Sequence, residues 1–168
     1  GLALLGISGK AEDLHILEVL GKHDEFTLYA AGSATRLLKG KKKNEFLMKL
    51  AENVEGWGKL SIIYEIDYSD EAARLWTIKK GCRNNVGLSY AANVCAIKGG
   101  MAEILKKLNA GEYSPEEAEE IYHGVCDIFT GLLWPDEDQD GINEYTEALF
   151  ACREFKKIAD NMPDRKSV

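Results

Sequence analysis

The residues best suited to chemistry lie in an acidic stretch over positions 136–147. With Asp136 as the first position, carboxylates recur at the third, fifth, ninth and twelfth positions, and a glycine stands at the sixth. The calcium loop of an EF-hand uses oxygen ligands in this pattern, with a turn-forming glycine at the sixth position and a bidentate Glu at the twelfth. The pattern predicts a calcium site made by Asp136, Asp138, Asp140, Glu144 and Glu147.

A second interpretation of this stretch needs no metal. The apolar residue expected at the eighth position is shifted, since Ile142 stands at the seventh and Asn143 at the eighth, and the motif occurs once in the chain. An exposed acidic linker whose last acid or amide caps the following helix gives the same composition, because helix N-termini favour such residues. Both interpretations stay open at the sequence level.

Aromatic and amide side chains form the second candidate site. Aromatic residues anchor many protein interfaces, and amides supply hydrogen bonds around them. In a stacked array of repeats, residues at the same position of successive units line one face. We therefore expect a partner-binding surface for a protein or peptide, with core packing as the alternative role of each aromatic. Its members are Trp57, Asn84, Asn85, Tyr90 and Asn93.

Other reactive side chains do not form a recognisable catalytic set. His123 and Cys126 could share a helix face, but no third group is placed to orient such a pair, so ordinary packing is the favoured role. The chain has four cysteines without a CxxC pair, which favours reduced core thiols over disulfides or a metal site. We expect no catalytic residues, no cofactor apart from the calcium ion, and a cytoplasmic location.

Helices are the elements expected to position these residues. Only three prolines interrupt the chain, and apolar residues recur at helical spacing. Ser114-Pro115-Glu116-Glu117 and Asp70-Glu71 are helix starts, Asn44 and Asn84 or Asn85 are expected caps, and the tail from 162 to 168 is expected to be frayed. The expected helices cover about 2–7, 12–20, 24–38, 44–54, 57–66, 71–80, 86–98, 101–108, 114–134 and 143–161.

Charge is distributed unevenly along the chain. Residues 1–111 carry 16 basic and 13 acidic side chains, whereas residues 112–168 carry 5 and 15. The acidic end disfavours general nucleic-acid binding, which depends on cationic contacts with phosphates. The lysine-rich run over 39–43 is expected to be a solvated loop between helices. No apolar stretch reaches the roughly 20 residues that a membrane-spanning helix needs.

The short helices recur at a nearly constant interval. They begin at Asp13, Asn44, Glu71 and Met101, which are about 27 to 31 residues apart, and such a period indicates a helical-repeat array. One repeat cannot bury its own apolar face, so the repeats must stack. An unrelated helical bundle is the alternative.

Two stretches carry a family resemblance. ALLGISGKAEDLHILEVLGKHDEFTLYAAGSATRLL resembles HEAT-type repeats. KLAENVEGWGKLSIIYEI, with LWTIKKGCRNNVGLSYAANVCAIKG after it, is similar to a group of bacterial helical-repeat proteins that often carry the label limonene hydroxylase. The resemblance covers about residues 1–110. The residues themselves include no haem-type Cys motif, no GxGxxG and no paired His and carboxylate cluster for such chemistry.

The resemblance implies an all-α fold, a right-handed α-α superhelix of HEAT-like repeats. We expect one domain over residues 1–168, with repeats over about 1–111 and an acidic pair of capping helices over about 114–161. The predicted function is a non-catalytic scaffold that binds a protein or peptide on its concave face. The alternatives are the hydroxylase or monooxygenase that the resemblance implies, a calcium-binding helical protein, and DNA-damage recognition as in some HEAT-like proteins.

Overall fold

The computed structural model describes residues 1–161, and within this part of the chain every regular element is a helix. The predicted all-α class is therefore confirmed, while the predicted frayed tail lies outside the described residues. The α-helices are α1 (Leu2–Ser8), α2 (Leu14–Leu20), α3 (Asp24–Leu37), α4 (Gly40–Ala51), α5 (Trp57–Glu65), α6 (Glu71–Trp76), α7 (Ser89–Lys98), α8 (Met101–Asn109), α9 (Pro115–Leu133) and α10 (Ala148–Asn161). Shorter helices are η1 (Ala11–Asp13), η2 (Thr77–Gly81) and η3 (Ile142–Glu144).

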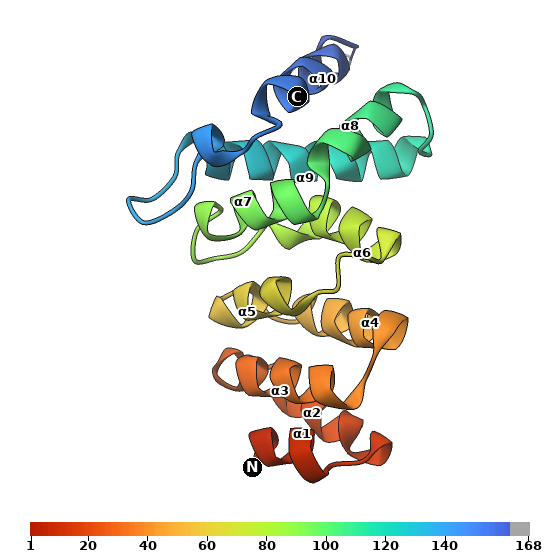
Figure 1. The fold of residues 1–168 in the computed structure, drawn as a ribbon, viewed down its shortest axis with the longest axis vertical. Helices are drawn as coiled ribbons and strands as arrows, with labels where there is room; N and C mark the ends of the chain where they lie inside the picture. The colour runs from red at the N-terminus through yellow and green to blue at the C-terminus, as the bar shows by residue number, and fades with distance from the viewer. Residues whose placement is uncertain (162–168) are drawn as a thin grey trace, which may run out of the picture.

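The helices are stacked in chain order along the long axis of the molecule, from α1 at one end to α10 at the other (Figure 1). One series runs through the stack, because α1 packs on α3, α3 on α5, α5 on α7 and α7 on α9. The intervening helices pack beside this series, α2 on α3, α4 on α5 and α8 on α7. One continuous apolar core therefore connects neighbouring helices through the stack.

Small residues let the first helices approach one another closely. The middle of α3 is buried at Ala30, Ala31, Ser33 and Ala34, as its composition predicts. A Cβ added to Gly6 of α1 would lie 2.9 Å from the Cα of Ser33. The Ser33 hydroxyl donates to the Leu2 carbonyl at 2.8 Å, so the contact also satisfies a polar group at the α1–α3 interface.

Two helix starts lie where the sequence predicts them. The Asp70 side chain caps α6 by accepting from the Ala72 N–H at 3.1 Å. At α9, the Ser114 hydroxyl accepts from the Glu117 N–H at 3.2 Å, and the Glu117 carboxylate accepts from the Ser114 N–H at 3.2 Å. This reciprocal pair is a capping box, which satisfies N–H groups that a helix start otherwise leaves unpaired.

The region before α4 differs from the expected loop. Gly40 begins α4 with φ of +53°, so the lysines at 41–43 lie in the first turn of a helix. Asn44 is not a cap, because it is buried within α4. Its side chain donates to the Asp67 carbonyl and accepts from the Asp67 N–H, both at 2.9 Å. Asn44 thus ties α4 to the turn that precedes α6.

A π-helical turn, η2, follows α6 without a break and ends at Gly81, where the sequence predicts the helix over 71–80 to end. The turn packs against α9, where a Cβ added to Gly124 would lie only 1.9 Å from the Ile78 carbonyl oxygen. Only a glycine at position 124 permits this backbone-to-backbone approach. The π-helix is rare, and single π-helical turns often occur at functional sites.

The acidic C-terminal helices also differ in one boundary. The expected last helix over 143–161 starts five residues later, as α10, because residues 142–144 form η3 and residues 146–147 form a turn before Ala148. The α10 helix packs on α8. In the described part of the chain, no helix combines the length and apolar character needed to cross a membrane.

Candidate functional site

Two of the predicted partner-binding residues meet at the surface. The Trp57 and Tyr90 rings, from α5 and α7, form an edge-to-face pair with centroids 5.2 Å apart and planes at 76°. Trp57 is 63% exposed, so core packing does not account for it. Edge-to-face pairs add favourable electrostatics between the ring edge and the opposite face, which fixes the orientation of both rings.

Two further tyrosines extend this pair into a groove of about 610 Å³. Tyr64 lies about two helical turns after Trp57 on α5. It donates its hydroxyl to the Tyr90 carbonyl at 3.3 Å. Tyr64 is 56% exposed, and Tyr29 of α3 is 54% exposed. We call this surface the aromatic groove, defined by Tyr29, Trp57, Tyr64 and Tyr90.

One end of the aromatic groove is acidic. Asp24 and Glu25, at the start of α3, line it together with the rings. The Asp24 carboxylate accepts from the Gly58 N–H at 3.2 Å and is therefore fixed beside Trp57, while Glu25 is exposed. Gln139, from the acidic loop, lines the groove as well. Ring faces beside carboxylates provide sites for apolar side chains and for a cation stacked on a ring.

The three predicted asparagines do not share a role. Asn84 uses its side chain within its own loop, donating to the carbonyls of Cys82 and Gly87 and accepting from the N–H groups of Val86 and Gly87. It shapes the loop before α7 and does not cap that helix, which starts at Ser89. Asn85 is exposed, and its N–H donates to the Glu55 carbonyl at 2.7 Å. The Asn93 Nδ2 is buried without a hydrogen-bond partner among the described residues.

The acidic loop is folded by contacts of its own. The Asp136 carboxylate accepts from the Ser89 hydroxyl at 2.5 Å, and the Glu144 carboxylate accepts from the Gly141 N–H at 2.9 Å. Among residues 1–161, no three acidic, histidine or cysteine side chains gather where they could hold a metal ion. The set Asp136, Asp138, Asp140, Glu144 and Glu147 is therefore not assembled as a calcium site. The contacts of Asp136 and Glu144 fit the acidic-linker interpretation.

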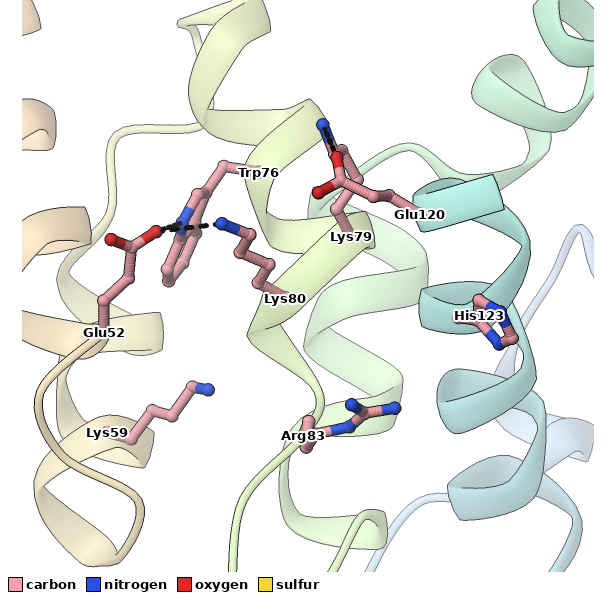
Figure 2. A pocket seen from close by; sticks show the side chains of 8 residues that line it. All are labelled: Glu52, Lys59, Trp76, Lys79, Lys80, Arg83, Glu120 and His123. Atoms are coloured by element: carbon pink, nitrogen blue, oxygen red, sulfur yellow. Dashed lines mark hydrogen bonds and ion pairs between the residues drawn. The ribbon is translucent and has the colours of Figure 1, made fainter. Parts of the chain in front are cut away.

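A second cavity, of about 710 Å³, lies between α5, η2 and α9 (Figure 2). Lys59 projects from the opposite side of α5 to Trp57, because two residues along a helix differ by about 200°. Lys79 and Lys80 come from η2, and Arg83 stands two residues after its end at Gly81. We call this the basic pocket, and its lining residues are Glu52, Lys59, Trp76, Lys79, Lys80, Arg83, Glu120 and His123.

Three of the four cations in the basic pocket are paired with carboxylates. Lys80 lies 3.2 Å from Glu52, and the Trp76 indole N–H donates to the same carboxylate oxygen at 3.3 Å. Lys79 forms an ion pair with Glu120 (Figure 2), and Arg83 binds Asp127 at 3.0 Å.

These contacts lower the pKa of two of the carboxyl groups. The hydrogen bonds from Lys80 and Trp76 hold the pKa of Glu52 below its usual value, and Lys79 does the same for Glu120. Both carboxylates are therefore charged at neutral pH and act as built-in counter-ions of the pocket.

Lys59 is the exception among these cations. Its ammonium group has no ion-pair partner within 4.0 Å among residues 1–161, and it points into the pocket (Figure 2). Burial lowers the pKa of Lys59; Cys95 and Glu55 oppose this shift, and the nearby Arg83 adds to it. The buried Cys82 thiol does not supply a counter-charge, because a hydrogen bond with Cys95 and burial raise the pKa of Cys82.

The basic pocket is not predicted by any local pattern in the sequence. Its four cations are separated by up to 24 positions, and only the Lys79-Lys80 pair is local. Their convergence depends on η2, and no sequence signal for the π-helical turn was recognised. His123, considered with Cys126, instead lies 3.7 Å from Glu119 at the rim of α9.

Comparison of the chain with protein-family models, curated proteins and solved structures gave no match. The resemblance to HEAT-type repeats and to the group labelled limonene hydroxylase therefore stays a prediction.

Proposed function

We propose that this protein is a non-catalytic helical-repeat scaffold, a right-handed HEAT-like superhelix, that binds a peptide segment of a partner protein in the aromatic groove. The observation that carries the proposal is the exposed edge-to-face pair of Trp57 and Tyr90. A partner that covers this exposed indole would bury a large apolar area, which favours binding. We place the protein in the cytoplasm, and the four unpaired cysteine thiols support a reducing environment.

The shape and composition of the aromatic groove favour a peptide over a small metabolite. Its rings come from α3, α5 and α7, three neighbouring members of the series that runs through the stack, so the groove extends across several helices. An extended segment can place alternate side chains between such rings. Tyr and Trp are the residues whose loss most often costs binding free energy at interfaces, because they bury large areas with few rotatable bonds.

The charges beside the rings specify the kind of segment. Glu25 is exposed at the acidic end, and Asp24 is held beside Trp57 by the Gly58 N–H. An Arg or Lys side chain could lie over an aromatic face with its charge near these carboxylates. We therefore assign the groove to a segment with one basic residue flanked by apolar residues.

A display selection from a library of short randomised peptides tests this function. Selected peptides should be enriched in Arg or Lys beside apolar residues, and Trp57→Ala should weaken their binding by about 10-fold or more. Glu25→Gln should reduce the preference for the basic residue. Phe150→Ala, which removes an exposed aromatic from α10, is the matched control and should leave binding unchanged. Selected peptides that bind Trp57→Ala as tightly as the wild type would overturn the assignment.

A further inference from the structure

We propose that the basic pocket is a second binding site, for the phosphate groups of a small molecule. It is distinct from the aromatic groove, because Lys59 leaves α5 on the side opposite to Trp57. The proposal does not rest on peptide binding, and either site can fail without the other.

The first support is the convergence of cations. Lys59, Lys79, Lys80 and Arg83 line one cavity, against two lining carboxylates, Glu52 and Glu120. The lining thus has an excess of two positive charges, and an excess of one remains when Asp127, bound to Arg83, is included. Like charges repel at short range, so an anion bound among these side chains would stabilise the cluster.

The second support is the position of Lys59. Its side chain is half-buried, its ammonium points into the open cavity, and the described residues offer it no carboxylate within ion-pair distance (Figure 2). A partly desolvated cation without a partner lowers the free energy of unfolding, so its presence is not explained by stability. A bound phosphate would supply the missing counter-charge at this point.

The paired cations are available to a ligand as well. The Lys80–Glu52 pair is about half exposed at both side chains, and such pairs contribute little to stability. The Trp76 indole N–H donates to the Glu52 carboxylate, so Glu52 keeps this hydrogen bond when Lys80 turns toward a ligand. Lys59 and Lys80 can then contact one phosphate group together, and Arg83 can present a free N–H to a second.

The third support is the backbone that presents these residues. Lys79 and Lys80 belong to the π-helical turn η2, which widens the helix and changes the direction of the side chains after Trp76. Gly124 lets α9 pack directly against the backbone of η2, and this contact holds the turn in place. The cavity of about 710 Å³ has room for a diphosphate or a phosphate ester, beyond a single inorganic ion.

Calorimetric titration with sodium pyrophosphate, in a phosphate-free buffer at about 50 mM salt, tests the proposal. Wild-type protein should bind, and Lys59→Gln should weaken binding by about 10-fold or more, because a charged hydrogen bond is lost. Lys59→Arg should retain most of the affinity. Lys42→Gln removes the same charge from an exposed position on α4 and is the matched control, with a change below about 2-fold expected.

Three outcomes would overturn the assignment. No binding of pyrophosphate by the wild type up to about 10 mM, or an equal loss in Lys59→Gln and Lys42→Gln, would show a diffuse charge effect or no site. Binding of a short single-stranded oligonucleotide that depends on Lys59, without any binding of pyrophosphate, would reassign the pocket to nucleic acid. Trp57→Ala should bind pyrophosphate normally, which separates this result from a failure of the proposed peptide function. Circular dichroism should give the same helical signal for each variant.

Discussion

The contact between Gly124 and the π-helical turn gives a prediction with a worked magnitude. In Gly124→Ala, the new Cβ would start 1.9 Å from the Ile78 carbonyl oxygen and 2.9 Å from the Cα of Lys79. These are backbone atoms of a packed turn, so no rotamer change relieves the overlap. Forcing such groups apart costs up to about 3 kcal/mol, as in overpacked cores. Alanine regains about 1 kcal/mol through its higher helix propensity.

We therefore expect Gly124→Ala to lower the free energy of unfolding by about 2 kcal/mol. Gly32→Ala is the matched control, because Gly32 also lies inside a helix, α3, and an added Cβ meets nothing within 4 Å. The control should raise the free energy of unfolding by up to about 1 kcal/mol. The two glycine variants should thus differ by about 3 kcal/mol in the same assay.

Urea unfolding followed by far-UV circular dichroism measures both values, with the m-value checking that the transition stays comparable. Equal free energies of unfolding for Gly124→Ala and Gly32→Ala would refute the close approach of α9 to η2. The prediction also bears on the basic pocket, since a displaced η2 would move Lys79 and Lys80. Gly124→Ala should therefore weaken pyrophosphate binding even at temperatures where the protein stays folded.

Three further predictions concern stability. Lys59→Met should raise the free energy of unfolding at pH 7 by about 1 kcal/mol, since it removes a partly desolvated charge. The pKa of Lys59 is lowered in the folded protein, so this gain should be full below the folded pKa and fade as pH rises through it, which urea unfolding at several pH values can check. Asn44→Ala should cost about 2 kcal/mol by thermal unfolding, because the part-buried N–H and carbonyl of Asp67 lose their partner inside the structure. Ser114→Ala should cost about 1 kcal/mol in the same assay through loss of the α9 capping box, whereas Ser114→Asp should not.

Local signals in the sequence identified most helices of the fold. Ser114 with Pro115, and Asp70 before Glu71, combine cap and first-turn residues whose preferences depend only on neighbours in the chain. These starts lie where expected. The prediction of Asn44 as a helix cap is wrong because its amide binds the backbone of Asp67, 23 residues further along the chain. A local sequence pattern does not reveal such a distant partner.

The candidate site was predicted only in part. Trp57 and Tyr90 come together because they lie on successive helices of one series, and the repeat spacing already suggested a shared face. The basic pocket was missed because its cations converge only through the π-helical turn. In the acidic loop the residue types have the spacing of a calcium loop, but among residues 1–161 their carboxylates do not gather at one point, because spacing alone does not set side-chain direction.

The most direct test of the central claim is the affinity of Trp57→Ala for peptides selected on the wild-type protein, measured by fluorescence polarisation. Trp57 is largely exposed, so its removal should leave the unfolding transition nearly unchanged while binding weakens by about 10-fold or more. Phe150→Ala should bind with wild-type affinity. Undiminished binding to a folded Trp57→Ala protein would contradict the assignment of the aromatic groove as the partner-binding surface.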